Sequence, residues 1–267
     1  MKFGVCIGEL SPENLNEIDT AALCGAQFTE ASFYKLSFFT SEQLSEISAY
    51  AKEKKVTLDS ANGLFGEMPL FTSENDYKKA VEYIYRSFEL LSITDIKFIT
   101  FGSGKSRKIP DGMSVQAANE KFEALCTEVL DPLAQKYGYI IGIEPLNKEE
   151  TNYINTAAFG AELVKKMNCS AVKLLVDYYH FKKENENLAD IADYTDIISH
   201  LHIASAAVRC APLPNDGEEY GYSAFSKQLK NNVSTSVNMS IEGNIPEPRE
   251  KTIRASLDYL KHLYQTV

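Results

Sequence analysis

Short apolar runs alternate with longer amphipathic stretches along the whole chain of 267 residues. Eight of the apolar runs have the length and composition of strands buried on both faces, and a segment with helical spacing follows each. The expected strands are 3–7, 27–31, 56–60, 96–101, 139–144, 172–177, 197–202 and 236–242, and the expected helices are 12–23, 41–54, 73–91, 114–137, 156–167, 188–195, 223–231 and 248–264. Eight such units of roughly thirty residues predict an α/β fold, a parallel sheet closed as a (β/α)8 barrel.

A doubly wound open sheet is the alternative fold. Such a sheet usually carries a glycine-rich phosphate turn after its first strand, but residues 8–12 here read Gly-Glu-Leu-Ser-Pro without that pattern. Because no linker or low-complexity segment interrupts the chain, we expect one barrel domain over 1–267. Within it, the long helix 114–137 is expected to bend near Pro132.

Charge and hydropathy narrow the functional classes. The net charge of −10 argues against a nucleic-acid surface, which usually needs a basic patch. No stretch approaches the roughly 18 apolar residues of a membrane span, and the N-terminus lacks the apolar core of a signal peptide. The five cysteines are scattered without a Cys-x-x-Cys pair, which is typical of a reducing compartment. We therefore expect a cytoplasmic enzyme that binds neither nucleic acid nor membrane.

Four of the expected strands end in a side chain that can bind metal. Glu144 closes the fifth, Asp177 the sixth, His202 the seventh and Glu242 the eighth. A buried strand has no structural need for such a residue at its tip. One alone is explained more simply by bonds to a loop, but four in succession favour a site. In a closed barrel all strand ends of this kind meet on one face, where such enzymes keep their active sites.

Three carboxylates and one imidazole form an oxygen-rich ligand set. It favours one divalent metal ion, Mn²⁺ first, with Mg²⁺, Co²⁺ or Zn²⁺ as alternatives. Such an ion can polarise a sugar carbonyl beside a hydroxyl and stabilise an enediolate. Glu144 and Glu242 could then remove and return a proton at the carbon beside the carbonyl. This is the chemistry of an isomerase or epimerase of sugars or sugar phosphates.

Four segments resemble motifs of the xylose isomerase-like TIM-barrel superfamily of sugar phosphate isomerases and epimerases. They read Ile143-Glu144-Pro145-Leu146-Asn147, Val176-Asp177-Tyr178-Tyr179-His180, Leu201-His202-Ile203-Ala204 and Ile241-Glu242-Gly243. Within the superfamily the chain looks most similar to ketose 3-epimerases of the tagatose and psicose type. The resemblance implies that Glu144, Asp177, His202 and Glu242 bind the metal and that Glu144 and Glu242 are also the acid/base pair.

The resemblance also implies contacts with the substrate. It places Glu150 and Arg209 at the sugar and His180 at an oxygen near the carbonyl. The loop 101–110 contains two glycines, Lys105 and Arg107. A solvated basic loop explains it about as well as a grip on an anionic group, and for an anionic substrate we expect Arg107 to make the contact.

We also predict the positions of two further residues and two apolar segments. Glu30, at the tip of the second strand, is expected to support the site rather than to bind metal. His200 is expected to face the helices, on the side opposite to His202. The apolar segments 33–39 and 64–71 are expected to roof the barrel mouth, with a homo-oligomer contact as the alternative.

Three other functions remain open. A hydroxypyruvate isomerase or a keto-inositol dehydratase would use the same enediolate chemistry. An endonuclease IV-like DNA-repair enzyme is remote, because its three zinc ions need more histidines than the four of this chain. A metal-dependent sugar-binding regulator is disfavoured, because binding alone does not need the two potential bases Glu144 and Glu242.

Overall fold

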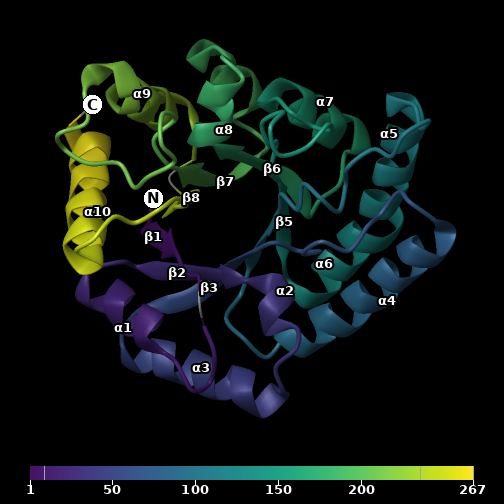
Figure 1. The fold of residues 1–267 in the computed structure, drawn as a ribbon, viewed down its shortest axis with the longest axis horizontal. Coiled ribbons are helices and arrows are strands. Elements are labelled where there is room, and N and C mark those ends of the chain that lie inside the picture. The colour runs from purple at the N-terminus through teal and green to yellow at the C-terminus, as the bar shows by residue number, and fades with distance from the viewer. Residues whose placement is uncertain (9, 235, 267) are drawn as a thin grey trace.

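A computed structural model describes residues 1–8, 10–234 and 236–266. It shows a closed barrel in which every strand runs parallel to the next and β1 pairs with β8 (Figure 1). The strands are β1 (Phe3–Cys6), β2 (Phe28–Ser32), β3 (Thr57–Asn62), β4 (Phe98–Phe101), β5 (Ile140–Ile143), β6 (Val172–Asp177), β7 (Ile198–Ile203) and β8 (Asn238–Ile241). The predicted (β/α)8 barrel is therefore confirmed, and the open doubly wound sheet is excluded.

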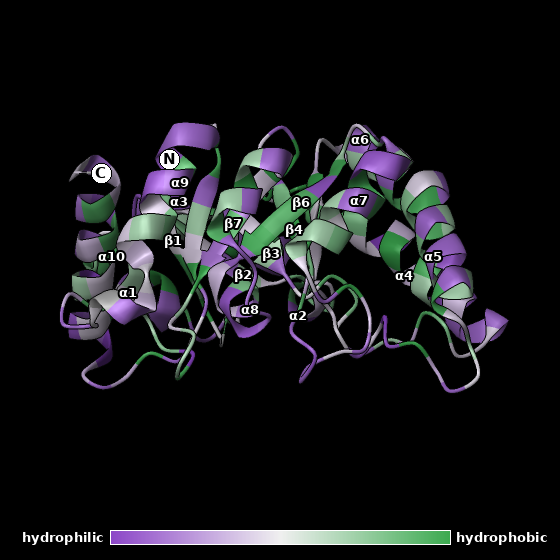
Figure 2. Ribbon diagram, turned by 90° about the horizontal axis from the view of Figure 1, so that it is seen from above, coloured by the Kyte–Doolittle hydropathy of each residue, from purple (hydrophilic) through white to green (hydrophobic). Residues whose placement is uncertain are grey.

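Helices surround the barrel (Figure 1). They are α1 (Asn16–Leu23), α2 (Phe33–Leu36), α3 (Ser41–Glu53), α4 (Glu74–Leu91), α5 (Val115–Ala124), α6 (Asp131–Tyr137), α7 (Ala157–Met167), α8 (Tyr178–Lys183), α9 (Tyr222–Asn232) and α10 (Arg249–Thr266). The short helices α2 and α8 were not predicted. Both follow a strand directly and lie at the same edge of the barrel, among the long loops (Figure 2). The expected helix 188–195 is the 3-10 helix η2 (Leu188–Tyr194), and a second 3-10 helix is η3 (Glu218–Tyr220).

The predicted bend in helix 114–137 takes a definite form. A π-helical segment, η1 (Leu125–Leu130), joins α5 to α6 immediately before Pro132. Proline has no N–H, and its ring clashes with the carbonyl four residues earlier in an α-helix. A π turn widens the helix at that point and relieves the clash.

The barrel interior below the mouth is filled by rings packed against glycines. The Phe98 ring stacks on His200 at 4.3 Å between centroids, and Phe28 approaches His200 edge-on at 5.9 Å. A Cβ on Gly142 would lie 2.3 Å from the Phe98 ring, and one on Gly4 would lie 2.6 Å from the Phe28 carbonyl oxygen. These two positions need glycine because the rings occupy the space of a side chain.

The expected orientation of His200 is wrong. Its Nε2 lies 3.1 Å from Glu30 inside the barrel, close to the ring of His202. Residues two apart on a strand point to the same face, so the alternation places both histidines inside.

The two apolar segments join the core of the protein. Phe33 packs on Phe88 of α4, and Phe65 packs on Phe101 at 5.0 Å. Phe101 in turn stacks on Phe122 of α5, on the outside of the barrel. These contacts are with the helical layer, so they do not show the predicted roof over the mouth. Phe38 is the large apolar side chain of segment 33–39 that stays exposed, at 62%.

None of the helices in the described part of the chain is both long and apolar enough to cross a membrane.

The packing of Gly142 gives a test of the barrel interior. We predict that Gly142→Ala lowers the free energy of unfolding by about 1–3 kcal/mol, because the added methyl group overpacks the Phe98 ring. Gly8→Ala is the control, since a Cβ there meets no atom within 4 Å, and it should change stability by less than about 0.5 kcal/mol. Urea unfolding measures both, and equal effects would contradict this account of the core.

Candidate metal and substrate site

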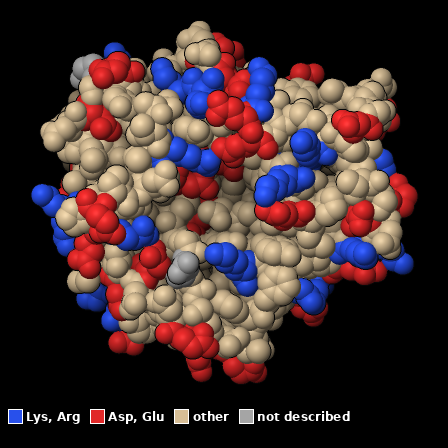
Figure 3. All heavy atoms as spheres, in the orientation of Figure 1, with Lys and Arg blue, Asp and Glu red and all other residues tan. Residues whose placement is uncertain are grey.

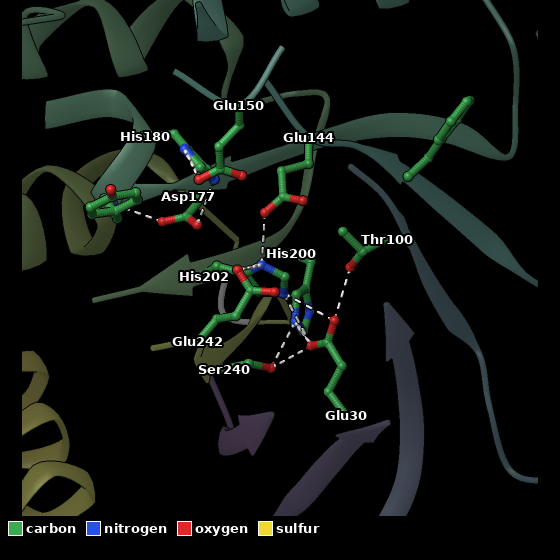
Figure 4. A network of polar contacts seen from close by, with 12 residues as sticks. Glu30, Thr100, Glu144, Glu150, Asp177, His180, His200, His202, Ser240 and Glu242 are labelled. Atoms are coloured by element: carbon green, nitrogen blue, oxygen red, sulfur yellow. Dashed lines mark hydrogen bonds and ion pairs between the residues drawn. The ribbon is translucent and has the colours of Figure 1, made fainter. Parts of the chain in front are cut away.

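The four strand-tip residues converge at the mouth of the barrel (Figure 4). Glu144 follows β5, Asp177 ends β6, His202 lies near the end of β7, and Glu242 follows β8. One ligand atom from each of them lies within 4.8 Å of those of all the others. The structure thus brings together the residues that the sequence grouped, because the parallel strands that carry them all end at this mouth.

His202 lies at the centre of this cluster. Its Nδ1 is 2.9 Å from Oε1 of Glu144 and 3.4 Å from Oε2 of Glu242, whereas its Nε2 is 3.0 Å from Oε1 of Glu30. A carboxylate that accepts the Nε2 proton leaves the Nδ1 lone pair free for a cation, which is the usual arrangement behind a metal-binding histidine. Burial lowers the pKa of His202, but Glu30, Glu242 and Glu144 together raise it well above its usual range.

Glu30 is fully buried and supports His202 from below. It accepts hydrogen bonds from the hydroxyl groups of Thr100 at 2.9 Å and Ser240 at 2.7 Å, and it contacts His200 and His202. Burial alone would raise the pKa of Glu30, but the two histidines bring it well below the usual range. Cys6, Glu30 and His202 also form a possible ligand set, but the bonds to Glu30 already satisfy its oxygens. Glu30 is thus placed as a supporting residue.

The carboxylates differ in their affinity for protons. Burial, and then the charge of Glu242, raise the pKa of both Asp177 and Glu144. Burial also tends to raise the pKa of Glu242, but His202 and Arg209 outweigh it and bring this pKa to about 2. Three carboxylates, those of Glu144, Asp177 and Glu242, thus share the two cationic side chains His202 and Arg209, and the cluster keeps an excess of negative charge.

These residues fit a divalent metal ion. Oδ2 of Asp177 and Nε2 of His180 are buried and have no hydrogen-bond partner among the described residues. The ligand set of carboxylates and one imidazole suits a hard or borderline dication. A cation between Glu144, Asp177, His202 and Glu242 would satisfy the free oxygen of Asp177 and offset the repulsion among the carboxylates.

His180 is held in one tautomer beside the cluster. The backbone N–H of Asn147 donates to its Nδ1 at 3.1 Å, so the ring proton lies on Nε2. That Nε2 is 3.6 Å from Oδ2 of Asp177. Burial lowers the pKa of His180 to about 3, which keeps the ring neutral. The structure therefore presents an N–H donor at the site, and the residue that fixes it, Asn147, had no predicted role.

Glu150 and Arg209 meet at the rim of the site. The Arg209 guanidinium donates to Oε1 of Glu150 at 2.6 Å and to Oε2 of Glu242 at 3.4 Å. It also lies over the Tyr179 ring, 4.8 Å from the centroid. Both predicted substrate-contacting residues are thus beside the cluster, and Tyr179 is a neighbour that the sequence did not identify.

Arg107 does not fit its expected role. Its side chain is 0% exposed, and the guanidinium donates to the carbonyl oxygens of Phe101 at 3.0 Å and Glu144 at 2.6 Å. These bonds tie the end of β4 to the end of β5. Arg107 therefore braces the backbone that carries Glu144 and is not open to an anionic group of a substrate.

Gly102, on the same loop, makes room for Glu144. A Cβ at position 102 would lie 2.1 Å from Oε2 of Glu144, so any side chain there would displace the carboxylate. The sequence shows Gly102 only as one of the two glycines of this loop. Its role depends on a contact between the end of β4 and the end of β5. These ends are far apart in the sequence, so no local pattern indicates the contact.

The fold and the site agree with a comparison of the chain with known families. A family model described as xylose isomerase-like TIM barrel matches residues 18–263. The chain belongs to this family. The superfamily suggested by the motifs is therefore confirmed.

Known proteins that resemble the chain include named epimerases, which are a class of isomerase. D-psicose 3-epimerase of Enterocloster bolteae is 26% identical over 214 residues, which are 76% of this chain and 70% of the relative. The structure of D-psicose 3-epimerase with D-tagatose from Clostridium cellulolyticum H10 has a TM-score of 0.85 and 19% identity, and the match covers 99% of both chains. The structure of 3-keto-D-glucoside 4-epimerase from E. coli has a TM-score of 0.82 and 23% identity, and the match covers 98% of this chain and 99% of that one.

The support that Glu30 gives to His202 can be tested without a substrate. We predict that Glu30→Gln weakens Mn²⁺ binding about 10- to 100-fold, because the amide no longer orients the imidazole as a carboxylate does. Calorimetric titration of Mn²⁺ measures the affinity. Glu67→Gln is the matched control, since Glu67 forms an exposed ion pair with Lys105. An unchanged affinity in Glu30→Gln would show that Glu30 does not position a metal ligand.

Proposed function

We propose that the protein is a metal-dependent epimerase of sugars in which a carbonyl lies beside a hydroxyl-bearing carbon. One observation carries the proposal: two glutamates, an aspartate and a histidine offer ligand atoms within 4.8 Å of one another at the mouth of the barrel. The names of the relatives, psicose 3-epimerase and keto-glucoside 4-epimerase, support the same reaction class.

Glu144, Asp177, His202 and Glu242 would hold the divalent cation, with Mn²⁺ preferred over Mg²⁺, Co²⁺ and Zn²⁺. The cation would supply Lewis-acid stabilisation of the negative charge that develops on the substrate oxygens.

Glu144 and Glu242 are the proposed acid/base pair. Glu242 stays ionised, because His202 and Arg209 hold its pKa at about 2, and it can accept the proton of the carbon beside the carbonyl. Glu144 would use one carboxylate oxygen for the cation and the other to hold a proton and deliver it to the opposite face of that carbon, and burial, which raises its pKa, favours this protonation. Two carboxyl groups whose environments push their pKa values apart suit these opposite roles. Loss of a proton from one face and its return on the other inverts the carbon.

Neighbouring residues complete the proposed site. The Nε2–H of His180 donates to a substrate oxygen near the carbonyl, since Asn147 holds the ring in that tautomer. Glu150 contacts the sugar and, through Arg209, is linked to Glu242.

The arginines of the site favour an uncharged sugar over a sugar phosphate. Arg107 is bonded to carbonyl oxygens in the interior, and Arg209 is engaged by two carboxylates. Neither offers the free guanidinium that a phosphate group would use.

The rival functions can be distinguished by their products. A dehydratase would release water, and a hydroxypyruvate isomerase would convert a three-carbon keto acid, whereas an epimerase redistributes stereoisomers of one sugar. An endonuclease IV-like reaction is disfavoured by the histidines: apart from His180, His200 and His202, the chain has His262, which lies in α10 on the outside of the barrel.

The role of Glu242 is tested by Glu242→Gln. We predict that Mn²⁺-loaded wild-type protein interconverts ketose epimers and that the variant loses activity by about 10²–10⁴-fold, because glutamine cannot accept the proton. NMR of the sugar mixture measures turnover, and the circular dichroism spectrum should stay unchanged. Glu250→Gln, on the exposed start of α10, is the control. Full activity in Glu242→Gln would remove this residue from the acid/base pair.

A further inference from the structure

A cavity of about 630 Å³ opens beside Glu242, on the side of the barrel formed by β1, β2 and β3. Its lining includes Gly8, Asn14, Ser32, Asn62 and Asn244. Figure 3, in the orientation of Figure 1, shows a hollow at the centre of the face with both acidic and basic side chains around it. Glu150, His180 and Arg209, the residues assigned to substrate contact above, are not among the residues that line this cavity.

The cavity is continuous with the reacting site. Glu242 lines it and also belongs to the cluster with Glu144, Asp177 and His202. A substrate whose carbonyl and hydroxyl oxygens lie at that cluster can extend past Glu242 into this cavity. The cavity lies within the range of roughly 300–1,000 Å³ that takes drug-sized ligands, and a single hexose ring fills only part of it.

The lining suits an uncharged, hydroxyl-rich group. The amides of Asn14, Asn62 and Asn244 offer both donors and acceptors, as sugar hydroxyls require. The charged residues beside them, Glu17 and Arg249, form an ion pair at 2.6 Å. Because the Arg249 charge is already paired, the cavity has little attraction for a phosphate or carboxylate.

We propose that this cavity is a subsite for a glycosyl group attached to the reacting sugar, so that the preferred substrate is a keto-glycoside rather than a free ketose or a ketose phosphate. The proposal rests on the proposed epimerase function. It assigns the α-hydroxyketone to the metal cluster and the second sugar, or a polyol of similar size, to the cavity.

Gly8 allows the subsite to be filled without disturbing the cluster. A Cβ there meets no atom within 4 Å, and its φ lies outside the left-handed region, so a larger side chain can be accommodated. Gly8→Leu should occupy part of the cavity, and Gly8→Ala is the matched control with one carbon. Both variants leave Glu144, Asp177, His202 and Glu242 unchanged.

The experiment compares three substrates in Mn²⁺-loaded protein: a keto-hexopyranoside bearing a second sugar, a free 2-ketohexose and its phosphate ester. We expect the keto-glycoside to have the highest kcat/KM. Gly8→Leu should lower this value by about 10-fold or more while changing that of the free ketose by less than about 2-fold. Gly8→Ala should resemble the wild type.

Each other outcome has a separate meaning. Turnover of the free ketose without a preference for the glycoside, or an equal loss on both in Gly8→Leu, would overturn the subsite and leave the epimerase function standing. A preference for the phosphate ester that grows in Glu17→Gln, which frees Arg249, would show a phosphate subsite instead. No turnover of any substrate by protein shown to bind Mn²⁺ would contradict the proposed function itself.

Discussion

The structure must accommodate a high negative charge at one end of the barrel. Glu30, Glu144, Asp177 and Glu242 surround a single imidazole, that of His202, and three of these carboxylates are almost fully buried. Isolated buried carboxylates are strongly destabilising, so each must be paired, protonated or bound to a cation. Glu30 is paired by two histidines and two hydroxyl groups. The remaining three share His202 and Arg209, which leaves a natural place for a divalent ion.

Much of the surrounding chain serves to hold this arrangement. Gly102 leaves the space that the Glu144 carboxylate occupies, and Arg107 fixes the backbone carbonyl of Glu144 from within the protein. Asn147 sets the tautomer of His180, and Phe98 supports His200 under the cluster. Neither Gly102 nor Asn147 offers chemistry of its own. They determine where the reactive groups point, which is the main contribution of a rigid scaffold to a site.

The barrel and its four candidate ligands could be predicted from the sequence. Hydrophobic periodicity indicates the strands, and the candidate ligands are the polar residues at the strand ends. Parallel strands buried on both faces are continuous apolar runs, and a polar residue at the end of each run is visible without a structure. Helices α2 and α8 were missed because four and six residues are too short to show a helical period.

The interactions that the sequence did not show depend on burial and on backbone groups. The charge of Arg107 is evident, but its position inside the protein, bonded to two carbonyls, is not. Asn147 reaches Nδ1 of His180 with its backbone N–H at 3.1 Å and with its side-chain Nδ2 at 2.8 Å, and the sequence does not show that these two residues, 33 positions apart, are in contact. Gly102 acts by the absence of a side chain opposite a residue 42 positions later, Glu144. The placement of His200 could have been predicted, because the two-residue period of a strand puts it on the same face as His202.

The central claim is that the carboxylate cluster moves a proton at carbon with the help of a bound cation. Solvent exchange tests it most directly: metal-stripped protein, with and without added Mn²⁺, is incubated with a keto-sugar in D₂O and followed by NMR. We predict that only the reloaded protein introduces deuterium at the carbon beside the carbonyl and that the epimer carries the label from its first appearance. Epimer formed without deuterium, or equal exchange with and without the metal, would contradict the account.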